Sequence, residues 1–293
     1  MAQPRELRRR IKSVDNTRQI TKTMEMVATS KLKRARDRVV AARPYAAALA
    51  EIIRDLHDPT LVERFPLLRR VDGNIRRAAV VGITSNRGLA GAFNANLIKE
   101  TSARVRAFER EGAEVELHMI GKKGVGYFKY LGRTMATAHQ DISDRPSMDD
   151  AIRVIDPLVR RFEAAELDAV DIVFAKFVSA LSTPATSLRV LPVQVETADG
   201  TDGGGGTAPN YILRPSAEEI VGVVLPLYVR NTMYRCLVET AASEQGARRT
   251  AMKNATDNAG DMLDTLRRTY NRARQAQITQ EISEIVGGAA ALE

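Results

Sequence analysis

The chain reads Ala-Ala-Val-Val-Gly-Ile-Thr at residues 78–84, an apolar run that predicts a buried strand. The turn Ser85–Gly88 follows it, and a helix is predicted from about Ala92 to Arg110. Strands and helices then alternate, with strands at 114–120, 134–139, 170–178 and 188–195, and helices at 123–131 and 148–165. Such alternation is typical of a mostly parallel sheet with helices on its faces. The sequence therefore predicts a central Rossmann-like α/β domain over residues 75–212, with a glycine-rich loop at 199–209.

The segment before this domain, residues 1–60, has the pattern of a long coiled-coil helix. It contains neither proline nor glycine between Pro4 and Pro44, and Pro44 is expected to kink it. Two heptad positions form a predicted seam, one with Leu7, Val14, Thr21, Ala28, Ala35, Ala42, Leu49 and Leu56, the other with Ile11, Arg18, Glu25, Leu32, Val39, Ala46 and Ile53. The seam is weakest at Arg18, Thr21 and Glu25, where polar side chains replace apolar ones.

The segment after the domain, residues 213–293, predicts a second long helix. A capping box at Ser216–Glu219 begins it, it runs to about Val286, and a bend or break is expected near Pro226. A stripe of mostly small residues follows one face, formed by Met252, Ala255, Ala259, Met262, Leu266, Tyr270, Ala273 and Gln277. Because both helices leave the same domain and each has an apolar stripe, the sequence predicts that they pair as an antiparallel coiled coil.

The positive charge of the chain is concentrated at the N-terminus. Residues 1–43 hold thirteen Lys and Arg against four Asp and Glu, a net charge of +9, whereas the whole chain carries +8. Such a segment favours an anionic partner: nucleic acid, a lipid surface or acidic loops of other proteins. A basic coiled-coil nucleic-acid-binding protein is therefore one alternative. However, the basic residues overlap the seam instead of preceding it, and aromatic residues are not interleaved with them.

The motifs of common catalytic and cofactor sites are missing. The glycines after the first strand lack the G-x-G-x-x-G spacing, and Gly121–Gly126 lacks the phosphate-loop pattern. His57, His118 and His139 have no metal-ligand spacing, and the single Cys236 excludes an internal disulfide. The sequence therefore predicts no catalytic residue, no cofactor and no metal, and its start does not have the pattern of a secretory signal.

Four segments of the chain resemble one protein family. They are ITKTMEMVATSKLKRA at 20–35, TSNRGLAGAFN at 84–94, SEQGARRTAMKNATDNAGDM at 243–262, and YNRARQAQITQEISEIVGGAAAL at 270–292. Each is similar to a signature of the gamma subunit of F-type ATP synthases, and they occur in the family's order. The loop at 196–210 departs from the family in its length and glycine content, and the cysteine pair of the redox-regulated chloroplast type is absent.

The resemblance implies a non-catalytic rotor in the central stalk, which couples proton flow through a membrane c-ring to ATP synthesis at beta subunits and regulates ATPase activity. It implies alpha, beta and epsilon subunits and the c-ring as partners, no nucleic acid, and a peripheral position on the cytoplasmic face of a bacterial inner membrane. By position, the resemblance assigns partner contact or coupling to seven residues: Lys22, Met24, Arg248, Arg274, Gln275, Thr279 and Glu281.

Overall fold

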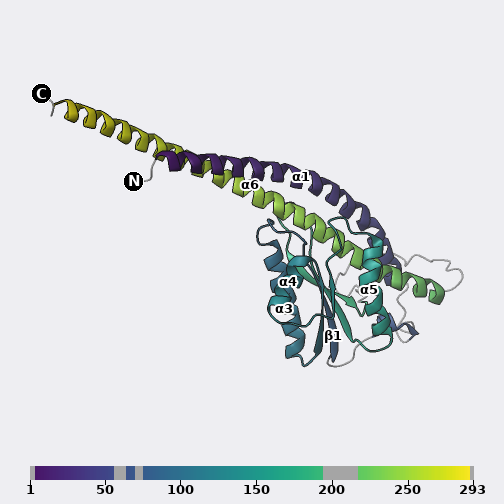
Figure 1. Ribbon diagram of the computed structural model, residues 1–293. Helices are drawn as coiled ribbons and strands as arrows, with labels where there is room; N and C mark the ends of the chain where they lie inside the picture. The colour runs from purple at the N-terminus through teal and green to yellow at the C-terminus, as the bar shows by residue number, and fades with distance from the viewer. Residues whose placement is uncertain (1–3, 56–63, 70–74, 194–216, 291–293) are drawn as a thin grey trace, which may run out of the picture. The chain divides into compact units, whose positions relative to one another are not determined.

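The computed structural model describes residues 4–55, 64–69, 75–193 and 217–290 (Figure 1). These form two compact units, one from the described residues of Met1–Thr29 and Arg248–Glu293, the other from those of Ser30–Ala247. The helices α1 (Pro4–Asp55) and α6 (Ala217–Ala290) each contribute residues to both units. The predicted capping residue Ser216, together with Leu56, His57 and the glycine-rich loop, lies outside the described residues.

The larger unit contains a five-stranded sheet in the order β3-β2-β1-β4-β5. Its strands are β1 (Arg77–Ile83), β2 (Glu114–Ile120), β3 (Thr137–His139), β4 (Ala169–Ala175) and β5 (Ala185–Leu191). The strands β1 to β4 run parallel to one another, and β5 is antiparallel to β4. The link from β4 to β5 is too short for a crossover, which takes about a dozen residues or more, so β5 must run back along β4. The predicted, mostly parallel sheet is confirmed.

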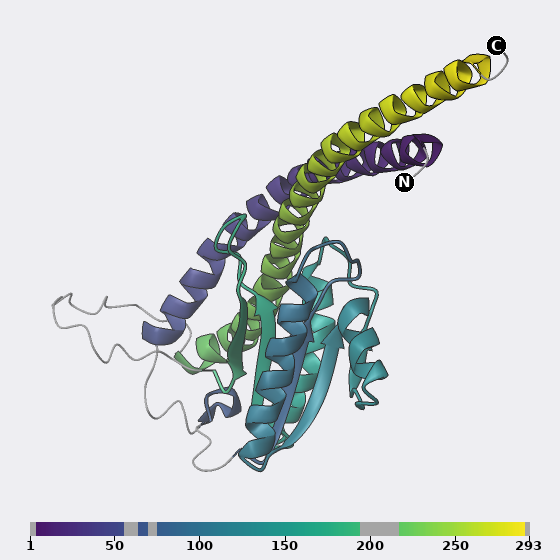
Figure 2. The ribbon, with the colours of Figure 1, turned by 90° about the vertical axis from the view of Figure 1, so that its left-hand side faces the viewer.

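Helices cover both faces of this sheet. On β1, Ala79, Val81 and Ile83 belong to a core shared with α5 (Met148–Glu163), the short helix η1 (Pro66–Leu68) and the first half of α6. Ala78 and Val80 belong to a second core, shared with α3 (Phe93–Arg110) and α4 (Lys122–Tyr130), and Figure 2 shows α3 lying in front of the sheet. Because successive side chains of a strand point to opposite faces, a strand covered on both sides is buried along its length, as β1 is from Ala78 to Ile83.

The heptad pattern of α1 is confirmed in most positions. Buried seam residues are Leu7, Thr21 and Ala28 in the smaller unit and Leu32, Ala35, Val39, Ala46, Leu49 and Ile53 in the larger one. Arg18 is exposed and Glu25 is partly exposed, as expected for the polar part of the seam. The helix continues past Pro44, which is exposed, as far as Asp55.

The break expected near Pro226 does not occur, because α6 is continuous from Ala217 to Ala290. A proline inside a helix removes one hydrogen bond and costs about 3 kcal/mol. Leu225 and Val229, on either side of the proline, are fully buried in the core that covers the sheet. Burial of these side chains offsets the lost hydrogen bond, so packing decides the path of the chain here.

The stripe predicted on the second half of α6 is correct in part. Met252 and Ala259 are buried, but Met262 is 55% exposed and its neighbour Leu263 is 1% exposed. A coiled-coil seam advances by alternating steps of three and four residues, and the order of these steps sets its phase. The seam of α6 passes through Met252, Thr256, Ala259 and Leu263, in steps of four, three and four. The prediction began with a step of three and was therefore one residue early at Met262.

Within the smaller unit, α1 and α6 pair in opposite directions. The Thr256 hydroxyl donates a hydrogen bond to Thr21 Oγ1 at 2.8 Å, and Thr21 in turn donates to the carbonyl of Arg18. Nε of Arg18 lies 4.0 Å from the place where a Cβ on Gly260 would be. Moving back along α1 thus corresponds to moving forward along α6, as in the predicted antiparallel coiled coil. A partly buried polar pair of this kind helps to fix the register of the two helices.

We expect Thr21→Cys combined with Thr256→Cys to form a disulfide under mild oxidation, because the two side chains already touch. The measurement is the shift of the non-reduced chain on a denaturing gel. Thr23→Cys with Thr256→Cys is the matched control, since Thr23 is exposed and donates to its own helix at Gln19. Equal bridging in the two pairs would contradict the register.

Candidate functional site

The seven residues singled out by the family resemblance all belong to the smaller unit. Lys22 and Met24 lie on α1, and the others lie on α6. The exposed ones are Lys22, Arg274, Gln275, Thr279 and Glu281, whereas Met24 is partly exposed and Arg248 is buried. Five of the seven side chains are therefore accessible to a partner, and Arg248 contributes mainly inside the fold.

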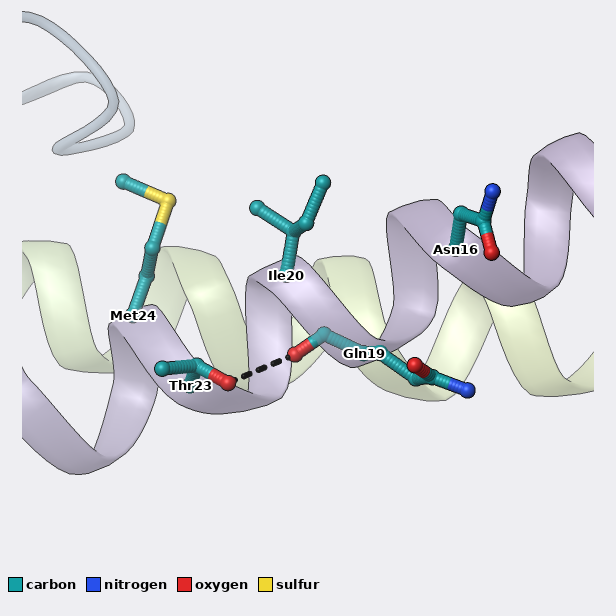
Figure 3. Close-up of a pocket in the computed structure, with 5 residues that line it drawn as sticks. All are labelled: Asn16, Gln19, Ile20, Thr23 and Met24. Carbon is teal, nitrogen blue, oxygen red and sulfur yellow. Dashed lines mark hydrogen bonds between the residues drawn. The ribbon is translucent and has the colours of Figure 1, made fainter.

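Met24 borders a shallow groove on the surface of α1 (Figure 3). The groove is lined by Asn16, Gln19, Ile20, Thr23 and Met24, and Ile20 is 59% exposed. Figure 3 shows Ile20 and Met24, one helical turn apart, projecting from the same side of the helix. Met26 and Val27, which follow on the same helix, are also more than half exposed. Adjoining apolar side chains that the fold leaves in solvent suit contact with another protein.

The last part of α6 has no α1 residue opposite it. Because Thr21 lies opposite Thr256, the first helical residue, Pro4, lies opposite a position near Arg274. Every described side chain from Arg274 to Val286 is exposed, including four large apolar ones: Ile278, Ile282, Ile285 and Val286. This single helix presents both apolar and polar groups to solvent, as expected of a surface that contacts other chains.

Two of the candidate residues in this segment form hydrogen bonds within their own helix. The Thr279 hydroxyl donates to the carbonyl of Gln275 at 2.9 Å, and Gln277 Nε2 donates to Glu281 Oε1 at 2.8 Å. A carboxylate oxygen has more than one lone pair, so Glu281 can still accept from a partner. This part of the candidate site is therefore an exposed helix surface with polar and apolar groups.

The glycine-rich stretch at 121–126 forms the start of α4, and its backbone amides are already engaged. Lys122 N donates to Asn86 Oδ1, Lys123 N to the carbonyl of Ser85, and Gly124 N to Thr84 Oγ1, at 2.9, 3.1 and 2.9 Å. Gly121 has φ +93°, and a Cβ there would lie 2.1 Å from the Thr84 carbonyl oxygen. A phosphate bound at a helix N-terminus uses free amides of this kind. Here the amides tie α4 to the end of β1.

In the part of the chain that the structure describes, no three His, Cys, Asp or Glu side chains come together in a way that could hold a metal ion.

None of the helices in the described ranges combines the length and the apolar character needed to span a membrane.

His118 is a buried titratable side chain on β2. Its Nδ1 lies 2.8 Å from Thr137 Oγ1, and its Nε2 lies 3.6 Å from Glu116 Oε2. Burial lowers the pKa of His118 below its ordinary value of 6.5. Arg161 holds Glu116 through two hydrogen bonds of 2.6 and 2.7 Å, which lower the pKa of that carboxyl. The folded chain therefore favours a neutral imidazole beside an ionised Glu116.

We expect the larger unit to lose stability as the pH falls below 6.5, because the unfolded chain then binds a proton that the folded His118 resists. This contribution is complete above pH 6.5 and is lost as the pH falls through 6.5 towards the lowered pKa, with a slope of at most ~1.4 kcal/mol per pH unit. Urea unfolding at pH 7.5 and 5.5 measures it. His118→Gln should show a smaller difference between the two pH values, and an unchanged difference would contradict the assignment.

Comparison with known proteins identifies the family. Residues 3–292 match the family model described as ATP synthase. The ATP synthase gamma chain of Gemmatimonas aurantiaca is 58% identical over 100% of both chains. That of Frankia casuarinae is 44% identical, over 99% of this chain and 98% of its own. The chain therefore belongs to the family of ATP synthase gamma chains.

Solved structures share the fold. A chain of the Euglena gracilis mitochondrial ATP synthase OSCP/F1/c-ring structure aligns with a TM-score of 0.65 and 23% identity, covering 99% of this chain and 94% of that one. A chain of the Tetrahymena thermophila mitochondrial ATP synthase central stalk/c-ring structure aligns with a TM-score of 0.61 and 22% identity, covering 80% and 99%. A gamma chain is a non-catalytic stalk subunit of ATP synthase.

Proposed function

We propose that this chain is the rotor of the central stalk of an F-type ATP synthase and couples proton flow through a membrane c-ring to ATP synthesis at beta subunits. The observation that carries the proposal is the 58% identity to an ATP synthase gamma chain over the full length of both chains. The regulation of ATPase activity and of proton flow belongs to the same proposal. No finding supports the nucleic-acid alternative.

The partners that we propose are the alpha and beta subunits, the epsilon subunit and the c-ring. Alpha and beta subunits would contact the exposed segment Arg274–Val286 and the groove around Ile20 and Met24, since these surfaces combine apolar and polar groups. A rotor acts by differential contact: each conformation of a beta subunit meets a different side of the helix pair, so rotation changes their relative free energies. The basic N-terminal helix suits acidic loops, because electrostatic attraction is long-ranged and tolerates sliding.

We further propose three functional parts: an N-terminal coiled-coil helix at 1–60, an α/β domain at 75–212, and a C-terminal coiled-coil helix at 213–293. The ATP synthase F1 sector is peripheral to the membrane, and for this chain we propose the cytoplasmic face of a bacterial inner membrane. In this arrangement the helices transmit rotation and the α/β domain connects them to the base of the stalk.

The test is complementation of a bacterial strain that lacks its own gamma chain. The tagged chain should copurify with alpha, beta, epsilon and c subunits, and membranes should show ATP-driven proton pumping. Purification with nucleic acid, and without ATP synthase subunits, would favour the alternative. Copurification without pumping would refute the coupling role.

A further inference from the structure

The link between β4 and β5, residues 176–184, packs against both long helices in the larger unit; we refer to it as the β4–β5 connection. Its Phe177 is 6% exposed. This side chain belongs to a separate apolar cluster with Leu32, Ala35 and Val39 of α1 and Val238 and Ala242 of α6. One aromatic side chain at the end of a central strand is therefore buried together with residues of both helices.

Side chains of α6 form hydrogen bonds with the last backbone groups of β4, where its neighbouring strand β1 has already ended. β1 pairs with β4 only as far as Val173, so the next backbone groups on that side have no strand partner. Ala175 N donates to Thr240 Oγ1 at 3.2 Å, and Ser243 Oγ donates to the Ala175 carbonyl at 3.1 Å. Thr240 and Ser243 are buried. Two α6 side chains thus supply the hydrogen bonds that a neighbouring strand would otherwise give to Ala175.

The backbone of Phe177 is held by both helices as well. Its N–H donates to Glu239 Oε2 of α6 at 3.1 Å, and its carbonyl accepts from Arg43 Nη2 of α1 at 3.1 Å. Further along, a Cβ on Gly246 would lie 3.2 Å from the Ala180 carbonyl oxygen, so the connection approaches α6 closely. Backbone and side chain of one residue therefore link α1, α6 and the sheet.

We infer that the β4–β5 connection is a joint at which both long helices are fixed to the end of β4, with Phe177 as its positioning residue. The inference rests on the proposed rotor function, in which torque passes between the helices and the α/β sheet. Turning α6 against the sheet would leave the buried Glu239, Thr240 and Ser243 without their partners, and such groups strongly resist separation. Turning α1 would separate its apolar residues from Phe177 and break the part-buried hydrogen bond of Arg43. By contrast, the ion pair of Lys31 with Asp144, which also ties α1 to a loop of this unit, is partly exposed and adds little.

The test uses the complete ATP synthase in membrane vesicles. In Phe177→Ala we expect ATP hydrolysis to stay within about twofold of the unmodified complex, while the ratio of proton pumping to hydrolysis falls about fivefold, a size typical of changed coupling. Phe128→Ala is the matched control, since Phe128 is 2% exposed but belongs to the core under α3 and α4. It should lower the melting temperature in the same way and leave the ratio unchanged.

A second variant avoids a cavity. Arg43→Ala removes the α1 hydrogen bond to Phe177, and Arg106→Ala removes the same charge from an exposed site on α3, where Arg106 donates to the Ser102 carbonyl of its own helix. The ratio should fall in Arg43→Ala and not in Arg106→Ala. If Phe177→Ala fails to assemble, Arg43→Ala and its control variant still test whether the β4–β5 connection acts as a joint.

An unchanged ratio of proton pumping to hydrolysis in both Phe177→Ala and Arg43→Ala would overturn the inference that the β4–β5 connection acts as a joint. An equal fall in Phe128→Ala would also overturn it, because general loss of stability would then explain the effect. Absence of pumping with the unmodified chain would instead count against the proposed rotor function, so the two failures are distinguishable.

Discussion

Asp171→Ala is expected to destabilise the larger unit by about 3–5 kcal/mol, the usual cost of removing one partner from a buried ion pair. Asp171 lies on β4 with 1% exposure and accepts hydrogen bonds from Arg104 of α3 and Arg189 of β5. Both guanidinium groups also lie over the ring of Phe108, at 4.4 and 5.3 Å from its centroid. Without the carboxylate, two partly buried cations would remain close together near the ring of Phe108, with no Asp171 to neutralise them.

The measurement for Asp171→Ala is hydrogen exchange of the β4 and α3 amides in the full chain under increasing urea. Glu163→Ala is the control, because Glu163 is exposed on α5. Replacing the whole cluster, with Asp171→Leu, Arg104→Met and Arg189→Met, should recover most of the loss, since a packed apolar set avoids the desolvation of charges. A loss below about 1 kcal/mol in Asp171→Ala would show that the ion pairs contribute as weakly as exposed ones.

The second large effect concerns coupling. Arg274→Ala with Gln275→Ala should leave the chain folded and the complex assembled, because both side chains are exposed. If they hold one beta conformation more tightly than the others, losing one charge-assisted hydrogen bond changes that equilibrium roughly tenfold or more. We therefore expect impaired ATP turnover or impaired coupling to proton transport.

ATP hydrolysis and ATP-driven proton pumping in membranes measure this coupling effect, with assembly checked on native gels. Arg272→Ala is the control, because it removes the same charge from an exposed position of the same helix outside the segment Arg274–Val286. Because a helix turns about 100° per residue, Arg272 lies about 160° from Arg274 around the axis. Wild-type rates of both activities in the Arg274 and Gln275 double variant would show that these side chains are not coupling contacts. The shape of the helix pair would then be what transmits torque.

The elements of the fold were predictable from the sequence because their signals are local. The apolar run at 78–84 and the heptads of α1 depend on spacing along one segment, and the structure places them within a few residues of the expected positions. The errors arose where packing outweighs a local rule. Pro226 lies inside an unbroken helix between the buried Leu225 and Val229, and the seam of α6 passes through Leu263 and not through Met262.

The candidate site was predictable only in part. Its residues came from a resemblance, and the structure adds that the segment from Arg274 onward lies beyond the end of α1. The contacts of Glu239 and Thr240 with the end of β4 were not predicted, because they join positions more than sixty residues apart. One signal in the sequence was available. Polar residues such as Ser243 are unusual at the core-facing positions of a helix that covers an apolar core, and the structure shows that Ser243 is buried.

The hydroxyls of Thr240 and Ser243 sit at the carboxyl end of β4, next to β1, where the strand order reverses. In open α/β sheets this is the position at which soluble ligands bind. Here α6 occupies this position, and α6 belongs to the same chain as the sheet. Its effective concentration at the position is therefore set by the chain itself and not by the concentration of a free ligand. A nucleotide arriving from solution would have to displace a tethered competitor. In this sheet the position that usually binds a soluble ligand is filled by side chains of the same chain.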